Sequence, residues 1–462
     1  KECHLMSNIN SIYEVANKAL AKSFKKSNSI IIKDHSMESL STIESNFDKK
    51  HYTLNESFTN EETREIQTLD LNILEKIRSQ FGKNGKVQAT IGGHPEFDYL
   101  ANTNSVKNGF TVSLFIDIQG STKLGVTYSP DKVFLIKNTI IKCVIETIQA
   151  FDGHVHRIMG DAVLAFFRSN GSARESAIDA LNCGTLIVEF MRSIVCPYLA
   201  EQGVEKDVGI RIGIDYGEKE SVIWGMYGYP GASEITATSF FVDIAAKLQQ
   251  KAPRNRILIG KSLKELLDLP EDIWCYKLTK SKDLESIEYY ITPNYTDANG
   301  KAINYNQYVL NHKEYLSMLP IEDNSSTSKI KIDAVLKQKG KPSNDDYKPC
   351  SRIIRPSLGI EFKTKIEVPE SINGFKVKFR VRNTGAEAAK EENNANHETI
   401  IESYNSSIIE ISPGYYRCNH WENTSFLGLH FMYVSVLDNK DKVIIPEKRF
   451  SVYVGDPLIE SN

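Results

Sequence analysis

The pattern of apolar and polar residues predicts a buried strand and an amphipathic helix near the middle of the chain. Residues 111–117 (TVSLFID) are mostly aliphatic, aromatic or β-branched and end in a charge, which is typical of a buried strand. A helix is expected to begin at Pro130, directly after the capping residue Ser129. Apolar residues then recur at spacings of three and four as far as Ile148, so this helix has one apolar face.

A hairpin, a second helix and a fourth strand follow. The stretches 154–159 (HVHRIM) and 162–167 (AVLAFF) predict two strands joined by a tight turn. A helix over 173–198 and a strand over 208–215 complete the order β-α-β-β-α-β. This order predicts an α+β domain with the ferredoxin-like, split βαβ arrangement.

Changes in composition divide the 462 residues into four zones, enough for several folded units. Residues 1–105 form a polar, mostly helical region, and residues 106–293 hold the predicted α+β domain. Residues 294–350 are rich in Asn, Lys, Asp and Ser, as in a polar linker. From 351 to 462, period-two alternation between turn residues predicts an antiparallel β-sandwich. Helical patterning outside the α+β domain falls on 13–24, 62–81 and 305–319.

The charge and cysteine content argue against several classes of protein. The 56 Lys and Arg residues nearly balance the 59 Asp and Glu residues, so no net field attracts nucleic acid or anionic lipid. Seven widely spaced cysteines suit neither a zinc site nor a disulfide framework and indicate a reducing, cytoplasmic setting. No apolar stretch approaches the length of a membrane span, so membrane insertion is not expected.

Two aspartates are expected to meet at one edge of the predicted sheet. Asp117 ends the first strand, and Asp161 lies in the turn of the hairpin beside it. Neighbouring carboxylates repel each other unless a cation lies between them, and oxygen ligands suit Mg²⁺ or Mn²⁺. We therefore expect two divalent cations on Asp117, Asp161 and the carbonyl of Ile118. Taken alone, ordinary strand-end and turn roles also explain both aspartates.

Residues next to Asp117 are candidates for binding a nucleotide. Gly120 relieves crowding in the loop after the strand, where amide groups near Ser121 and Thr122 can cradle a triphosphate. Phe115 shares the strand face of Asp117 by the two-residue period. It either packs under a nucleotide or belongs to the core.

Four stretches in combination resemble the class III nucleotidyl cyclases: FIDIQGSTKL, RIMGDAVLAFF, GIRIGIDYGE and VDIAAKL. This resemblance covers about residues 107–292. Within that class, DIQGSTKL and EITATSFFVDIAAKL are most similar to the bacterial pyrimidine cyclases of Pycsar antiphage systems. The later stretch FKVKFRVRNTGAEA resembles the sensor domain attached to defence cyclases and nucleotidyltransferases.

The resemblance implies which residues bind the metals and the base. Asp117 and Asp161 match the metal-binding aspartates, and Arg157 and Thr236 match the two base-contacting positions. Arg157 offers five N–H donors and no acceptor, which suits the carbonyl groups of uracil. We therefore expect UTP as the preferred nucleoside triphosphate, with CTP second and purines poor.

The resemblance also implies a homodimer with composite active sites. Asp243 and Lys247 occupy the positions where the family has its transition-state Asn and Arg. Lys247 still supplies a cation on the same helix face as Asp243, whereas Asp243 cannot donate as Asn would. Each site is expected to take Asp117 and Asp161 from one chain and Lys247 from the other.

The expected function is conversion of UTP to 3′,5′-cyclic UMP and pyrophosphate, as a second messenger in antiviral defence. A downstream effector that responds to the cyclic nucleotide is the implied partner. A cytidylate cyclase, an adenylate or guanylate cyclase, and a catalytically silent nucleotide sensor are the alternatives, because a fold alone does not establish an activity.

Overall fold

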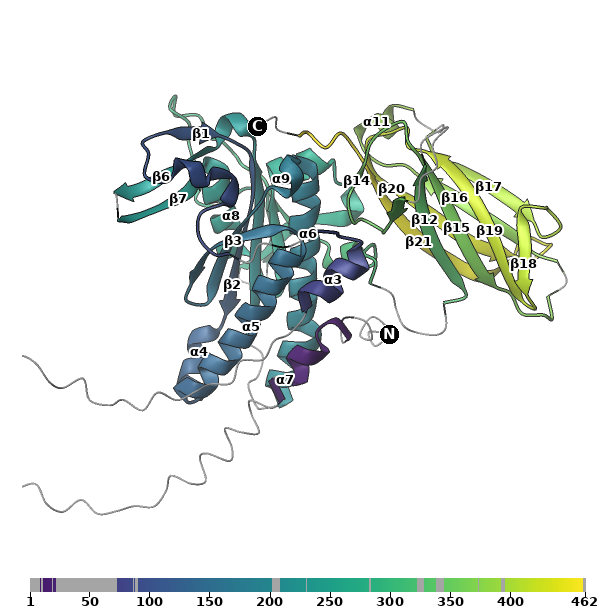
Figure 1. Cartoon of the computed structure of the whole chain (residues 1–462), viewed down its shortest axis with the longest axis horizontal. Coiled ribbons are helices and arrows are strands. Elements are labelled where there is room, and N and C mark those ends of the chain that lie inside the picture. The colour runs from purple at the N-terminus through teal and green to yellow at the C-terminus, as the bar shows by residue number, and fades with distance from the viewer. Residues whose placement is uncertain are drawn as a thin grey trace, which may run out of the picture.

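The strand predicted over 111–117 lies inside an eight-stranded sheet, which forms the core of one of two β-rich halves of the molecule (Figure 1). The computed structural model describes residues 9, 11–18, 20–21, 73–85, 87, 90–201, 208–229, 231–281, 284–321, 328–337, 345–372, 374–391 and 395–459. In the N-terminal zone, the described residues from 9 to 21 are largely helical and α3 spans Ile73–Phe81. The rest of the predicted helices over 13–24 and 62–81 lies outside the described residues.

The eight strands have the order β10-β9-β11-β8-β5-β2-β4-β3. Four of them, β5-β2-β4-β3, pair antiparallel in the split βαβ order that the sequence predicts. Strand β8 extends the sheet by pairing parallel to β5. The bounds are β2 (Thr111–Gln119), β3 (Gly153–Met159), β4 (Ala162–Phe167), β5 (Gly209–Gly217), β8 (Arg256–Gly260), β9 (Trp274–Ser281), β10 (Leu284–Glu288) and β11 (Gln307–Leu310).

Helices pack on both faces of this sheet. On one face α6 lies next to α5, and Gly184 of α6 approaches Ile212 and Ile214 of β5. On the other face α8 approaches β5 at Gly213. The sequence predicts a loop after β2, but α4 follows that strand directly, and a π-helical turn interrupts the helix predicted over 173–198. The bounds are α4 (Ser121–Thr127), α5 (Pro130–Ala150), α6 (Ala173–Phe190), α7 (Cys196–Glu201), α8 (Phe240–Lys251) and α9 (Lys261–Leu267).

A small sheet of three strands lies over part of the face that α8 also contacts. It consists of β1 (Val106–Asn108), β6 (Ile223–Tyr229) and β7 (Ala232–Thr238), in the order β1-β6-β7. Its buried side chains, Trp224 foremost, pack with Leu164 and Phe166 of β4 in a satellite hydrophobic cluster. The cluster therefore fixes β7 relative to the large sheet.

The C-terminal half is a sandwich of two five-stranded sheets, which confirms the predicted fold of this zone (Figure 1). The sheets have the orders β13-β12-β15-β19-β18 and β14-β21-β20-β16-β17. Their facing side chains form a separate hydrophobic core. The bounds are β12 (Ile330–Lys337), β13 (Asp345–Tyr347), β14 (Ile353–Ile354), β15 (Gly359–Glu367), β16 (Lys376–Arg382), α11 (Ala386–Lys390), β17 (His397–Glu402), β18 (Ile408–Ser412), β19 (Tyr415–Asn423), β20 (Gly428–Leu437) and β21 (Val443–Val454).

Part of the segment predicted as a polar linker, residues 294–350, belongs to the two folded halves. Strand β11 lies between β8 and β9 in the first sheet, and it shortens the helix predicted over 305–319 to α10 (His312–Leu316). Strands β12 and β13 belong to the sandwich. Composition alone missed these strands because β11 has only four residues, while β12 is amphipathic and flanked by polar stretches.

Helix α6 is buried along nearly its whole length. Together with α7 it forms a helical stretch, Ala173–Glu201, that is by length and composition long and apolar enough to cross a membrane. This corrects the expectation that no apolar stretch approaches such a length. However, 67% of its most apolar window is buried by the rest of the chain, as in a core helix.

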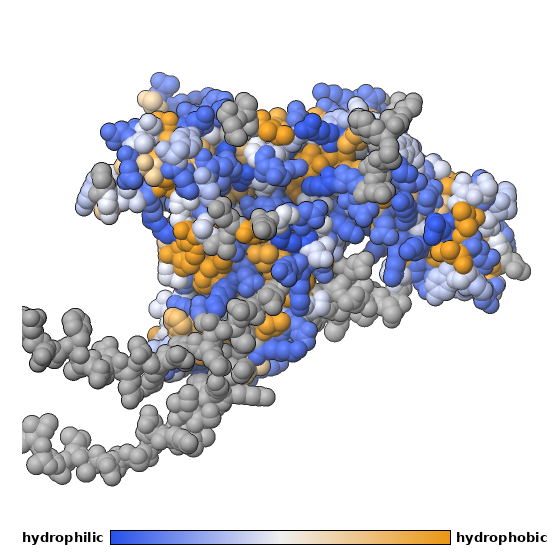
Figure 2. Space-filling model, in the orientation of Figure 1, coloured by the Kyte–Doolittle hydropathy of each residue, from blue (hydrophilic) through white to orange (hydrophobic). Residues whose placement is uncertain are grey.

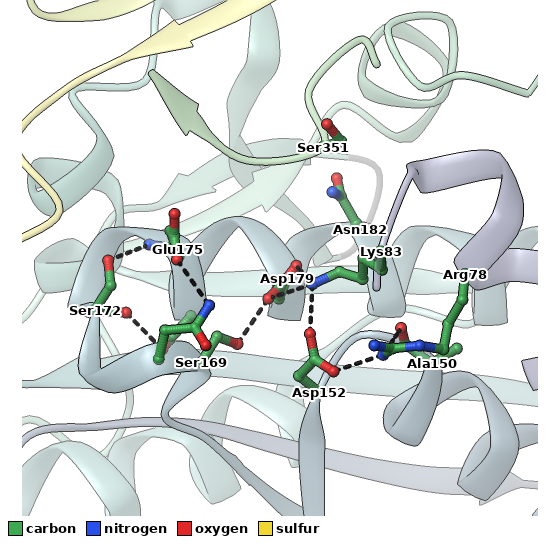
Figure 3. Close-up of polar contacts among 12 residues, drawn as sticks. Arg78, Lys83, Ala150, Asp152, Ser169, Ser172, Glu175, Asp179, Asn182 and Ser351 are labelled. Atoms are coloured by element: carbon green, nitrogen blue, oxygen red, sulfur yellow. Dashed lines mark hydrogen bonds and ion pairs between the residues drawn. The ribbon is translucent and has the colours of Figure 1, made fainter. Parts of the chain in front are cut away.

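A buried polar network joins α6 to the segment after α3 (Figure 3). The Asp179 carboxylate of α6 lies 2.8 Å from the Lys83 ammonium and accepts a 2.6 Å hydrogen bond from Ser169. Lys83 also contacts Asp152 at 2.9 Å, and Asp152 pairs with Arg78 of α3 at 2.5 Å. Burial raises the pKa of Asp179 to about 7, while the Lys83 ammonium works against this rise. Lys83 is therefore the cation that compensates a buried carboxylate.

We predict that Lys83→Met lowers the free energy of unfolding by about 3–5 kcal/mol, because it leaves the Asp179 carboxylate buried without its cation. Urea denaturation of the full chain measures this change. The double variant Lys83→Met/Asp179→Leu should recover much of the loss, and Lys331→Met, which changes an exposed lysine of β12, serves as the control. A Lys83→Met chain as stable as the wild type would contradict this role.

Candidate active site

Asp117 and Asp161 lie at the same end of the first sheet. Asp117 pairs with Ala162 in the register of β2 and β4, so it lies beside the turn that joins β3 and β4. The Ile118 amide donates a 3.2 Å hydrogen bond to the Asp161 carbonyl, which ties the turn to β2. Gly160 has φ +68°, a left-handed conformation that suits glycine in this tight turn. The two aspartates predicted to meet are thus neighbours in the backbone.

A basic side chain stands next to each aspartate. The Arg211 guanidinium of β5 pairs with the Asp117 carboxylate, and Lys137 Nζ of α5 lies 3.9 Å from Asp161 Oδ2. No local sequence pattern predicts either cation. The signal for Arg211 is the strand order, because Arg211 lies directly opposite Asp117 once β5 pairs with β2. Each of the two carboxylates therefore has a positively charged side chain beside it.

The donor atoms at this edge suit hard divalent cations. Two carboxylates and the Ile118 carbonyl offer only oxygen, which Mg²⁺ and Mn²⁺ prefer. Among the described residues, no group of three or more His, Cys, Asp and Glu side chains could hold a metal ion by itself. A metal bound by Asp117 and Asp161 therefore has to take further ligands from phosphate and water.

The turn after β2 places backbone amides near Asp117. Gly120 has φ +78°, and α4 begins at Ser121, which is buried, followed by Thr122, which is exposed. The Gly120 carbonyl accepts hydrogen bonds from the amides of Lys123 and Leu124. The amides of Ser121 and Thr122 come before the first intrahelical hydrogen bond, so they lack an acceptor within α4.

The face of the sheet that carries Asp117 also carries Phe115 and Arg157. Phe115 and Arg157 both lie opposite Leu164 of β4, so the three side chains form one row across the strands. The same row continues to Gly213 of β5. Phe115 is half-buried against the satellite cluster under β6 and β7. It shares the face of Asp117, as its position in the strand predicts.

Arg157 and the preceding His156 differ in exposure because a β-bulge lies between Val155 and Arg157. His156 is 3% exposed, and its Nδ1 lies 2.9 Å from the Gly92 carbonyl. Burial and, to a smaller extent, the Arg157 charge lower the pKa of His156, so it is neutral at pH 7. The Arg157 side chain is 47% exposed. Arg157 is thus the member of this pair that is open to a ligand.

Strand β7 brings Thr236 to the neighbourhood of Arg157. The Arg157 guanidinium forms an ion pair with the Glu234 carboxylate of β7, and Thr236 follows two residues later on the same strand face. Glu234 is not among the site residues that the sequence predicts. Its ion pair with Arg157 of β3 joins residues far apart in the sequence, so no local pattern predicts it.

Asp243 and Lys247 lie on the side of α8 that points away from the large sheet. Ala245 and Gln249 contact β5 at Gly213, and positions two residues away lie on the opposite side of a helix. Asp243 is exposed and Lys247 half-buried. Within the part of the chain that the structure describes, no hydrogen bond or ion pair joins either residue to Asp117 or Asp161. Helix α8 reaches Asp117 only indirectly among the bonds of these residues, because the Gln250 carbonyl accepts a 3.3 Å hydrogen bond from Arg211, which pairs with Asp117.

The sequence matches two family models, one for each half. Residues 106–289 match the adenylate and guanylate cyclase catalytic domain, and residues 306–455 match the adenylyl/guanylyl and SMODS C-terminal sensor domain. The second match begins just before β11, so it includes much of the segment predicted as a linker.

Relatives of known name cover nearly the whole chain. A cytidylate cyclase from Escherichia coli is 42% identical over 91% of this chain and 92% of its own length. A cytidylate cyclase from Staphylococcus aureus is 35% identical over 84% of this chain and 88% of its own length. Among solved structures, the adenylyl cyclase CyaB from P. aeruginosa is 20% identical, with a TM-score of 0.36, and the match covers 45% of this chain and 95% of that chain.

We predict that Gly213→Ala destabilises the fold and displaces α8. A Cβ atom at Gly213 would lie 2.2 Å from the Ala245 carbonyl oxygen and 2.2 Å from the Gln249 amide nitrogen, and backbone atoms cannot move aside as a side chain can. Overpacking of this kind costs about 1–3 kcal/mol, which thermal denaturation measures. Gly125→Ala in α4 is the control, because a Cβ atom there meets open space. Equal melting temperatures for Gly213→Ala and the wild type would refute the contact.

Proposed function

The chain belongs to the family of nucleotidyl cyclases in which an adenylate and guanylate cyclase catalytic domain precedes a C-terminal sensor domain, and from this premise we propose that it is a cytidylate cyclase. The reaction is conversion of CTP to 3′,5′-cyclic CMP and pyrophosphate. Membership of this family also confirms the resemblance to class III cyclases on which the expected site residues rest.

The observation that carries the proposal is the meeting of Asp117 and Asp161 at one end of β2. Two divalent cations, Mn²⁺ or Mg²⁺, held by these carboxylates and the Ile118 carbonyl would supply the positive charge that phosphoryl transfer requires. Both aspartates already attract a cation, Arg211 in one case and Lys137 in the other. This attraction supports their role as the anionic end of the site.

The chain's own residues then bind and orient the triphosphate. The amides of Ser121 and Thr122, which have no acceptor within α4, can donate to phosphate oxygens after the turn at Gly120. Arg211 lies beside Asp117 and adds a guanidinium that can contact the same phosphates. Phe115, on the same sheet face, gives the site an apolar floor.

CTP replaces UTP as the preferred substrate in this proposal. The expectation of UTP rests on the donors of Arg157 alone, and cytosine also offers acceptors at O2 and N3. The relatives that cover most of the chain are named cytidylate cyclases, which favours the alternative. UTP remains the second candidate, and the purines, which need more room, follow.

A homodimer with composite sites explains the placement of α8. Lys247 and Asp243 face away from the sheet that carries Asp117 and Asp161 of the same chain, so a second copy is the natural source of these groups. A twofold axis then generates two equivalent sites. Lys247 supplies the cation that stabilises charge on the transferring phosphorus group.

The cyclic nucleotide acts as a second messenger in antiviral defence, read by an effector that responds to it. The C-terminal sensor domain supports this role, because a domain of that description gives the cyclase an input of its own. A cytoplasmic location fits a reaction that consumes cellular nucleoside triphosphates.

We predict that the full chain with Mn²⁺ converts CTP to cyclic CMP in preference to UTP, ATP and GTP in one competition mixture. Chromatography with mass detection identifies the products. Asp117→Ala and Asp161→Ala should each reduce the rate at least about a thousandfold while the fold is retained, because each carboxylate supplies charge that the metal ions need.

Asp131→Asn is the control for these variants, since it removes an exposed carboxylate at the start of α5. Dominant cyclic AMP or cyclic GMP would overturn the proposed substrate. Ready turnover by either alanine variant would exclude the two-metal site.

We predict that two inactive chains complement each other. A mixture of Asp161→Ala and Lys247→Ala chains should regain activity, because one of the two composite sites in each mixed dimer then has all its groups. Each variant alone is the control, and native mass spectrometry establishes that mixed dimers form. If such dimers stay inactive, the site is built within one chain.

A further inference from the structure

We propose that Glu234 is a specificity-determining residue that accepts a hydrogen bond from the 4-amino group of the cytosine base, while Arg157 donates to the ring nitrogen and carbonyl beside it. This inference rests on the proposed function and names the group that separates CTP from UTP. It starts from the ion pair between the Arg157 guanidinium and the Glu234 carboxylate, which places a donor and an acceptor side by side.

The pair is open to a ligand and contributes little to folding. The Arg157 and Glu234 side chains are 47% and 33% exposed. Ion pairs this exposed contribute about 0–1 kcal/mol to stability. A contribution to the stability of the fold therefore does not explain why residue 234 is a glutamate.

The backbone holds Glu234 in a fixed place. Ile235 and Ala237, its neighbours along β7, are buried in the satellite cluster, so Glu234 and Thr236 project from the other strand face. On the β3 side, the bulge before Arg157 turns His156 inward. A side chain on an anchored strand can discriminate between bases better than one on a loop.

His156 does not compete with Arg157 for Glu234. Its Nε2 lies 3.8 Å from Glu234 Oε1, beyond a hydrogen bond, and its Nδ1 is engaged with the Gly92 carbonyl. Because burial lowers the pKa of His156, the ring is uncharged at pH 7. Arg157 is thus the group that neutralises the Glu234 carboxylate, and the other lone pairs of Glu234 remain for a ligand.

The edge of cytosine matches this pair. Cytosine carries an amino donor at C4 next to acceptors at N3 and O2, so the amino group meets the carboxylate and the acceptors meet the guanidinium. Uracil reverses the first two groups, because it carries a carbonyl at C4 and an N–H at N3. Its C4 carbonyl would face the carboxylate and its N3–H would face the guanidinium, so the contacts at C4 and N3 would be lost and only O2 could still accept from Arg157.

Purines are excluded on other grounds. Adenine offers the same order of amino group and ring nitrogen, so Glu234 and Arg157 do not distinguish it from cytosine by hydrogen bonds. Adenine has to be excluded by the size of its second ring. The proposal therefore concerns the choice between CTP and UTP alone.

The decisive variant is Glu234→Gln in the full chain. A glutamine amide can turn its NH₂ group toward the C4 carbonyl of uracil, which a carboxylate cannot do. We expect the ratio of kcat/KM for CTP to that for UTP to fall at least about tenfold, mainly through loss with CTP and gain with UTP. Glu220→Gln, an exposed carboxylate next to β6, is the matched control and should leave the ratio unchanged.

A binding measurement separates this inference from the proposed function. Calorimetric titration of CTP and of UTP with Mn²⁺ present should show tighter binding of CTP to the wild type and loss of that difference in Glu234→Gln. A wild-type chain that binds CTP selectively but forms no cyclic product refutes the cyclase activity and leaves the role of Glu234 standing. An unchanged ratio in Glu234→Gln, in turnover or in binding, overturns the role of Glu234.

Discussion

The register of β2 against its two neighbours determines where the candidate site lies. Its even-numbered residues are buried on the face that α5 and α6 cover, and its odd-numbered residues, Asp117 among them, project from the other face. A slip of one residue would exchange the two faces and bury Asp117 among apolar side chains. The apolar set of β2 therefore fixes the register, and the register aligns Asp117 with Arg211 and with the turn that holds Asp161.

Helix α6 links this sheet to the rest of the molecule through buried polar groups. Asp179 bonds to Lys83 on the N-terminal side, and Asn182 donates a 2.9 Å hydrogen bond to the Cys350 carbonyl on the side of the sandwich. Further along, Glu189 lies 2.8 Å from His312 Nε2. Figure 2 shows many hydrophilic residues, in blue, on the visible face of the molecule, with hydrophobic residues, in orange, among them. A polar group buried without a partner costs free energy, so these bonds specify one arrangement of the halves on α6.

The sequence predicts those features that depend on local pattern and misses those that depend on long-range pairing. The buried strand and the hairpin turn place Asp117 and Asp161 together, because strand ends follow from periodicity. Strands β11 and β12 lie in the polar segment 294–350 and are not predicted, because their pairing partners lie elsewhere in the chain. Glu234 shows the same limit. The expectation of UTP counts the donors of Arg157, but the acceptor beside it comes from a strand that no local pattern connects to β3.

The charges of the site are balanced within the chain before any substrate enters. Arg211 neutralises Asp117, Lys137 approaches Asp161, and Arg157 pairs with Glu234. All three pairs retain some exposure to solvent, so water screens them and exchanging one for a ligand contact costs little. At the proposed site, a triphosphate with its cations would bring both signs of charge, so it could contact the carboxylates as well as the basic side chains. Such balance also suits a chain whose net charge is close to zero, because local pairs and not a global field must then guide an anionic substrate.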